Sequence, residues 1–259
     1  MLVFRSSLFN TLYYLMLILF MLVMSPLFLT PRKTAMFAMR SWAWSADWLH
    51  RLVVGATVEI RGRENLIHGP CIIASKHQSL WETYGLLRLL DDPAIIYKQE
   101  LGWIPFFGWY AVKFRMVKVQ RGGRSKAIRS LIASARDRLA ENRQIIIFPE
   151  GTRRPPGAEP VYRAGVTAMY NELGVPVVPV ALNSGLFWPR RKFMRYPGKI
   201  IVDILPPIAP GLEREDFTRE LVSRLEGASD QLLLETAGAA NPPPLPETAR
   251  KRLEELGQS

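Results

Sequence analysis

The segment of residues 145–153, which reads IIIFPEGTR, constrains the fold of this chain more than any other part of the sequence. Its first four residues are apolar, a pattern typical of a short strand that is buried on both faces. The proline that follows cannot donate to a sheet ladder and the glycine permits a tight turn, so the strand ends there. We therefore expect Glu150, Thr152 and Arg153 at the carboxyl end of a central strand, where open α/β sheets bind their ligands. The alternative is an ordinary strand exit with solvated charges.

A second apolar strand, expected over residues 71–75, leads into the sequence HQSLWE, which places a histidine five residues before a carboxylate. If a helix begins just after His77, Glu82 lies about one turn further on and reaches back toward the imidazole. A carboxylate on one ring nitrogen fixes the tautomer and leaves the other nitrogen free to accept a proton. A lone histidine before a helix is more often structural. Its pairing with Glu82, together with the FPEGTR segment, favours a catalytic role.

These two segments resemble motifs of the glycerolipid acyltransferases of the 1-acyl-glycerol-3-phosphate acyltransferase type. The first motif of that family is a histidine, four residues and an aspartate. His77 occupies the histidine position here, and Glu82 stands where the family pattern has aspartate. The third motif, FPEGTR, matches in full at residues 148–153.

Two further blocks carry the same resemblance. The second family motif ends in an arginine after a short apolar strand, which corresponds here to Arg121, with Gln120 where the family has aspartate. Residues 98–109 precede it and are similar to the Lys, Leu, Pro, Gly segment of the family. The fourth motif, an apolar segment with a central proline, matches at residues 175–181. The four blocks stand in the family order and cover roughly residues 55–205.

Strand-like and helical segments alternate along most of the chain, which predicts an α/β fold with a mixed, mainly parallel sheet flanked by helices. The glycerolipid acyltransferase fold is also what the resemblance implies. We expect three parts: N-terminal membrane-associated helices over residues 1–54, an acyltransferase α/β domain over residues 55–238, and a proline-rich linker with a short helix over residues 239–259. The single cysteine, Cys71, excludes an intramolecular disulfide and is expected to pack inertly in its strand.

The resemblance implies a 1-acylglycerol-3-phosphate O-acyltransferase that makes phosphatidic acid in phospholipid biosynthesis. We expect His77 to take the proton from the sn-2 hydroxyl of lysophosphatidate, which then attacks the thioester of acyl-CoA or acyl carrier protein. Glu82 orients the imidazole and stabilises its charged form. Backbone amides near the start of the following helix are candidates for holding the oxyanion. The thioester is already activated, so no cofactor is required, and the three histidines share no metal-binding motif.

The acceptor phosphate needs cationic partners. The resemblance implies this role for two arginines, and we add one lysine as a candidate. Glu150 and Gly151 of the FPEGTR segment are expected to shape the acceptor site. The residues expected to bind substrate are Lys98, Arg121, Glu150, Gly151, Thr152 and Arg153.

The two departures from the family pattern leave the acceptor open. Glu82 adds a methylene to the usual aspartate, and Gln120 removes a charge beside the phosphate-binding arginine. Another lysophospholipid or a lyso-aminolipid is therefore the nearest alternative acceptor. A non-catalytic membrane protein that binds anionic lipid is an alternative from a different class.

The net charge of +11 and the sequence pI near 10.0 favour an anionic partner, such as anionic membrane lipid, a phosphorylated substrate or nucleic acid. Nucleic acid is disfavoured because the basic residues are scattered and the aromatic residues lie in apolar segments.

The N-terminal region favours membrane association. Residues 8–29 carry no charge and are long enough to span a bilayer or to lie within one leaflet. A signal peptide is disfavoured because no clear cleavage site with small residues follows. Arg32, Lys33 and Arg40 come directly after the apolar run. The positive-inside tendency therefore predicts an inner-membrane protein whose catalytic domain lies on the cytoplasmic side.

Overall fold

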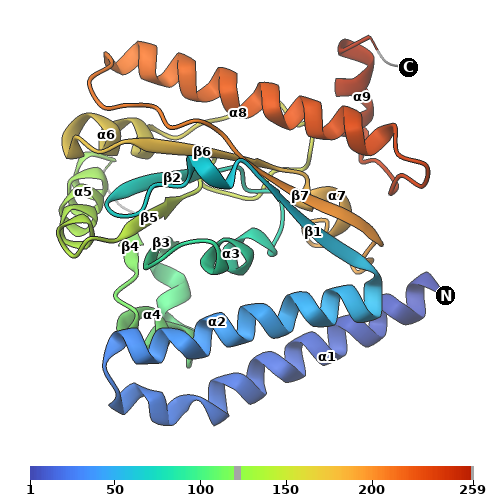
Figure 1. Ribbon diagram of the computed structural model, residues 1–259, viewed down its shortest axis with the longest axis horizontal. Coiled ribbons are helices and arrows are strands. Elements are labelled where there is room, and N and C mark those ends of the chain that lie inside the picture. Colours follow the sequence, from blue (N-terminus) through green and yellow to red (C-terminus); the bar gives the residue numbers. More distant parts are fainter. Residues whose placement is uncertain (120–123, 258–259) are drawn as a thin grey trace.

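The computed structural model describes residues 1–119 and 124–257, which contain a single seven-stranded sheet. The strands are β1 (Ala56–Arg61), β2 (Cys71–Ser75), β3 (Pro93–Lys98), β4 (Val117–Val119), β5 (Gln144–Ile147), β6 (Val177–Leu182) and β7 (Gly198–Ile204). Their order is β1-β7-β6-β2-β5-β3-β4, as Figure 1 shows. All neighbours pair in parallel except β6 and β7. The predicted mixed, mainly parallel sheet is confirmed.

The sheet separates two hydrophobic cores, because successive side chains of a strand point to opposite faces. In β2, Cys71 and Ile73 face one core while Ile72 and Ala74 face the other. Every residue of β2, β5 and β6 is buried, which explains why these strands read as continuous apolar runs. Burial raises the pKa of the Cys71 thiol to about 12, as expected for an inert core residue.

Helices cover both faces of the sheet (Figure 1). Three of them, α5, α6 and α8, pack on the face of Ile72, and α1 and α2 pack on the face of Ile73. The helices are α1 (Leu2–Val23), α2 (Arg32–Leu49), α3 (Glu82–Gly85), α4 (Phe107–Lys113), α5 (Arg124–Ala140), α6 (Ala164–Leu173), α7 (Ser184–Phe187), α8 (Arg214–Ala237) and α9 (Glu247–Glu255).

Two elements differ from what the sequence pattern indicates. Residues 114–119 have a strand-like pattern, but only β4 forms there, because Phe114 ends α4 and Arg115 adopts a positive φ of 53° that breaks the extended run. The helix expected directly after His77 begins only at Glu82 and is one turn long.

Helices α1 and α2 form an antiparallel hairpin along one side of the molecule (Figure 1). Helix α1 is long and apolar enough to cross a membrane, with a mean hydropathy of 1.8. It lies against the rest of the protein rather than projecting from it. At its start, Arg5 Nε donates to the carbonyl of Val53 at 2.6 Å. Near its end, the Tyr110 hydroxyl donates to the carbonyl of Met21 at 3.1 Å.

Large apolar side chains remain exposed on this side of the molecule. Trp44 and Trp48 of α2 are 62% and 65% exposed. Trp103, which precedes α4, is 73% exposed, and Trp109, which lies in α4, is 59% exposed. Eleven of the 22 residues of α1 are exposed as well. Exposed apolar side chains in such numbers are typical of proteins that associate with membranes, and aromatic rings suit the headgroup level.

The hairpin joins the α/β domain through a buried aromatic cluster that includes His50. Its ring lies 4.8 Å from that of Phe9 and 5.3 Å from that of Trp188 between centroids. His50 is 1% exposed, and its Nε2 atom has no hydrogen-bond partner among the described residues. Burial, with a smaller contribution from the nearby charge of Arg195, lowers the pKa of His50 to about 3.

We expect His50 to make the fold sensitive to acid. Between pH 6.5 and 3 the unfolded chain binds a proton at this position and the folded chain does not, so stability falls as the pH falls. The loss approaches about 1.4 kcal/mol for each pH unit in this window. Denaturant unfolding of the detergent-solubilised protein at pH 7 and pH 5 measures it. His50→Leu should lose less stability than the wild type on acidification, while His68→Leu, at an exposed histidine, should follow the wild type.

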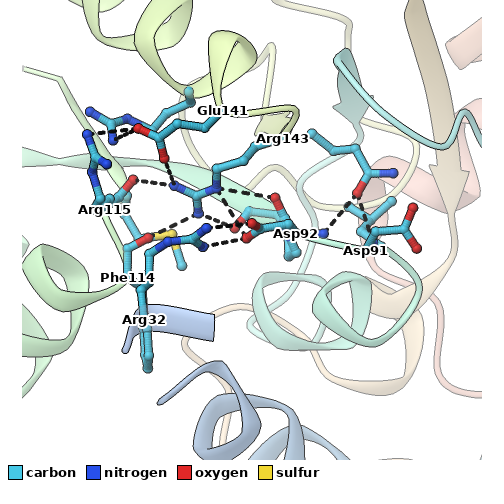
Figure 2. Close-up of polar contacts among 12 residues, drawn as sticks. Arg32, Asp91, Asp92, Phe114, Arg115, Glu141 and Arg143 are labelled. Carbon is cyan, nitrogen blue, oxygen red and sulfur yellow. Dashed lines mark hydrogen bonds and ion pairs between the residues drawn. The ribbon is translucent and has the colours of Figure 1, made fainter. Parts of the chain in front are cut away.

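A second buried link fastens the amino end of the sheet (Figure 2). Arg143, which precedes β5 and is fully buried, donates to the carbonyls of Pro93, Phe114 and Arg115 at 2.9–3.0 Å. Its Nε atom lies 3.2 Å from the carboxylate of Asp92.

The same carboxylate connects the hairpin to this link. Arg32 at the start of α2 binds both oxygens of Asp92, each at 2.6 Å. Burial acts to raise the pKa of Asp92, but the two arginines hold it below its usual value. The helical hairpin and the loops before β3 and β4 are thus joined at one ionic centre.

The C-terminal helix α9 covers the loop that follows the FPEGTR segment. Arg252 binds both carboxylate oxygens of Asp230 in α8, at 2.6 and 3.0 Å, and the Thr248 hydroxyl donates to the carbonyl of Pro156 at 2.7 Å. Ala249 and Leu253 are buried. The tail therefore packs on the domain and restrains this loop.

Candidate active site

His77 lies in the loop after β2, next to the carboxyl end of β5, as the sheet order predicts. Its imidazole stacks on the ring of Phe148 with a centroid distance of 4.1 Å and an interplanar angle of 18°. The side chain is 14% exposed. Phe148 therefore fixes the plane of the imidazole and still leaves one edge of it accessible.

Glu82 is fully buried and holds the inner edge of that imidazole. Its Oε1 atom lies 2.8 Å from His77 Nδ1. The same oxygen accepts hydrogen bonds from the backbone amides of Gln78 and Ser79, at 2.7 and 2.6 Å. An oxygen that receives two amide donors acts as an acceptor, so Nδ1 carries the ring proton of the neutral imidazole. The lone pair of Nε2 is then free to take a proton from a substrate.

Four backbone amides between His77 and Trp81 already have hydrogen-bond partners within the site. The amide of His77 donates to Glu150, those of Gln78 and Ser79 donate to Glu82, and that of Trp81 donates to the Ser79 hydroxyl. These four groups are satisfied within the loop and are not free to bind a substrate oxygen. They order this loop instead, and oxyanion binding by the other amides near the start of α3 stays a prediction.

Glu150 supports the loop from below. It is 1% exposed, its Oε2 atom accepts the amide of His77 at 3.0 Å, and its Oε1 atom lies 2.6 Å from Lys76 Nζ. Lys76 also lies 2.8 Å from Glu226 of α8. Burial raises the pKa of Glu150. Burial acts to lower the pKa of Lys76, but the carboxylates of Glu150 and Glu226 raise it above its usual value. This network positions the main chain that carries His77.

A cavity of about 390 Å³ lies beside this network, under α8 and α9. Lys76 and Gln78 line it, but His77 between them does not. The imidazole of His77 is therefore not part of the lining of this cavity.

The rest of the FPEGTR segment forms the turn that we expected. Gly151 has a φ of +66°, and its amide donates to the carbonyl of Phe148 at 2.9 Å. A Cβ atom there would lie 3.1 Å from the side chain of Arg163, so both the conformation and the space favour glycine. Thr152 and Arg153 are half-buried beside this turn. Their substrate contacts, and those of Glu150 and Gly151, stay predictions.

Two further residues, Lys98 and Arg121, were expected to bind phosphate. Lys98 is exposed at the end of β3, and its side chain has no ion-pair or hydrogen-bond partner within residues 1–119 and 124–257. Arg121 lies outside the described residues. Phosphate binding by both residues stays a prediction.

The sequence interpretation missed Ser184, which is fully buried at the start of α7 and donates its hydroxyl to Glu82 Oε2 at 2.8 Å. Ser184 follows β6, which is the parallel neighbour of β2 on the side opposite β5. Because the carboxyl ends of parallel strands lie at the same edge of a sheet, the pairing of β2 with β6 predicts that Ser184 lies near Glu82. With this bond, the carboxylate of Glu82 receives four hydrogen bonds in all.

Comparisons with known proteins find similarity to acyltransferases. A family model described as Acyltransferase matches residues 57–183. A 1-acyl-sn-glycerol-3-phosphate acyltransferase of Pseudomonas aeruginosa is 34% identical over 206 residues, which are 80% of this chain and 79% of that protein. The enzyme of the same name from Saccharomyces cerevisiae is 27% identical over 74% of this chain and 64% of its own length.

A solved structure shares the fold. The crystal structure of the 1-acyl-sn-glycerophosphate acyltransferase PlsC from Thermotoga maritima superposes with a TM-score of 0.73. The match covers 90% of this chain and 98% of that chain, at 24% sequence identity. Its agreement extends beyond the residues of the family model and includes most of the chain.

Proposed function

Because the chain belongs to the 1-acyl-sn-glycerol-3-phosphate acyltransferase family, we propose that it acylates the free sn-2 hydroxyl of 1-acyl-glycerol-3-phosphate to give phosphatidic acid. The acyl donor is acyl-CoA or acyl carrier protein. The relatives named for this acceptor support its choice. The contact between His77 and Glu82 carries the assignment of the site.

In this mechanism His77 acts as a general base through Nε2. The acceptor hydroxyl gives its proton to Nε2 while its oxygen attacks the thioester carbonyl. The tetrahedral intermediate then collapses, the carbon–sulfur bond breaks, and the imidazolium returns the proton to the thiolate. Glu82, fully buried beside Nδ1, stabilises the imidazolium. No acyl-enzyme is needed because the thioester is already reactive.

The nearest alternative is an acyltransferase for another lysolipid. Glu82 and Gln120 both depart from the family pattern, and Gln120 precedes a predicted phosphate ligand. The curated relatives favour lysophosphatidate, so it is the acceptor to test first.

For the location, we propose the inner membrane with the domain on its cytoplasmic side. The exposed apolar helix α1 and the exposed tryptophans support membrane association. The cations after α1 also have a structural role. Arg32 binds Asp92, and Arg40 donates to the carbonyl of Leu90 at 2.9 Å. Only part of this positive charge is therefore available to set the orientation.

The function is tested with purified membranes that contain the chain, labelled acyl-CoA or acyl carrier protein, and a panel of lysolipids. We expect phosphatidic acid from lysophosphatidate at a higher kcat/KM than from any other acceptor. A higher kcat/KM for another lysolipid would establish the alternative. Absence of acyl transfer to every acceptor with both donors would overturn the proposal.

The effects of the charge and of the side-chain length of Glu82 on catalysis can be separated by two substitutions. Glu82→Gln keeps an acceptor for His77 but removes the charge that stabilises the imidazolium, so we expect kcat to fall by at least about 10²-fold. Glu82→Asp keeps the charge and shortens the side chain, so we expect a smaller loss. Steady-state kinetics with lysophosphatidate measure both. Equal losses would show that the charge of Glu82 is not what the reaction requires.

A further inference from the structure

The loop after α7 brings a second arginine to the FPEGTR turn. Arg190 Nη1 donates to the backbone carbonyl of Arg153 at 2.7 Å. The next amide, that of Arg154, donates to the carbonyl of His77 at 2.7 Å. Two hydrogen bonds and one peptide unit therefore connect the Arg190 guanidinium to the catalytic histidine.

The segment of residues 184–190 is attached to the site at its start, and Arg190 at its end contacts Arg153. Ser184 at its start binds Glu82, and the amide of Gly185 donates to the side chain of Gln78 at 3.1 Å. Trp188 is 4% exposed, and its amide donates to the carbonyl of Ser184 at 2.8 Å. The arginine that follows two residues later is thus held in place rather than free to move with a loose loop.

The positive charge at this position is not neutralised by the protein. Within the part of the chain that the structure describes, Arg153, Arg190 and Arg191 have no carboxylate partner. Partial burial and the charges of Arg191 and Arg153 lower the pKa of Arg190, which reflects how close these cations lie. Cations that lie close together disfavour one another's charged form, so an anion that binds between them is stabilised.

We propose that Arg190 and Arg153 together bind a phosphate ester of a substrate. A guanidinium has five N–H donors. Arg190 uses one of them, on Nη1, for the carbonyl of Arg153, and the remaining donors are available for phosphate oxygens. This inference rests on the proposed acyl transfer and adds a residue to its binding site. The phosphate belongs either to the lysolipid acceptor or to the coenzyme A moiety of the donor.

Arg190→Gln is the sharpest test because it removes the charge and the guanidinium donors while keeping a polar side chain in the same loop. We expect the KM for one phosphorylated substrate to rise by about 10- to 100-fold, with kcat changed far less. Lys192→Gln removes the same charge from the same loop at an exposed side chain without a partner. Its KM values should stay within about twofold of those of the wild type.

The two sources of phosphate are distinguished by measuring both KM values in each variant. A rise for lysophosphatidate alone, absent with 1-acylglycerol as acceptor, assigns the acceptor phosphate. A rise for acyl-CoA alone assigns the donor. No rise for either substrate in Arg190→Gln, with the wild type active, overturns the inference and leaves the proposed function intact. If the wild type used a different lysolipid instead, the proposed acceptor would fail, and the same two KM values would still test Arg190.

Discussion

Replacing His77 with alanine is expected to lower kcat by about 10³-fold, the largest effect on activity that the site predicts. The substitution removes the imidazole that Glu82 orients, and with it the proposed general base. Lysophosphatidate should still bind, because the expected phosphate ligands are untouched, so KM should change little. Steady-state acylation of lysophosphatidate measures both quantities.

A matched control guards against a loss of folding in this experiment. His68→Ala makes the same change at a histidine whose side chain is 85% exposed, and it should leave kcat unchanged. Both variants should unfold at similar denaturant concentrations, since among the described residues the His77 side chain makes its polar contact with Glu82 and its ring contact with Phe148 alone. Full activity in His77→Ala would exclude general-base catalysis by this residue.

Replacing Arg143 with methionine is expected to destabilise the fold by about 3–5 kcal/mol, the largest effect on stability that the structure predicts. Its guanidinium donates to four main-chain carbonyls, those of Asp92, Pro93, Phe114 and Arg115, besides the carboxylate of Asp92. Methionine fills a similar volume but donates nothing, so these acceptors lose their partner in a buried place. Burial lowers the pKa of Arg143 to about 10, so the group is charged at neutral pH and its ion pair is lost as well.

Equilibrium unfolding in denaturant measures this loss. Arg136→Met removes an arginine from the exposed side of α5, where the side chain makes one hydrogen bond to the carbonyl of Glu172, and it should cost less than about 0.5 kcal/mol. Arg143 lies at the amino end of β5 and the catalytic loop at its carboxyl end. The folded fraction of Arg143→Met should therefore keep the wild-type kcat. A loss similar to that of Arg136→Met would show that Arg143 does not secure the sheet.

The strands were predictable because their interior position requires uninterrupted apolar side chains. The run from Ile145 to Ile147 and the strand β2 both lie where the sequence placed them. Phe114 is apolar as well, but it packs at the end of α4, because Arg115 turns the chain and Arg143 binds the carbonyls there. An apolar pattern cannot distinguish these two kinds of burial.

The candidate site was predictable where it is local in sequence. His77 and Glu82 meet because five residues of one loop bring them together. Ser184 and Arg190 come from a segment more than a hundred residues away, and only the order of the strands places it beside β2. Reading which strands are neighbours, and not only which segments are strands, was the missing step.

The four hydrogen bonds that Glu82 receives also determine where a proton can travel. The inner nitrogen of the imidazole is committed to a saturated acceptor, so protons enter and leave the ring through its outer nitrogen alone. In the proposed reaction, the hydrogen taken from the alcohol is the one delivered to the departing sulfur. Each turnover thus restores the resting enzyme by itself, and no exchange with bulk water is needed before the next substrate binds.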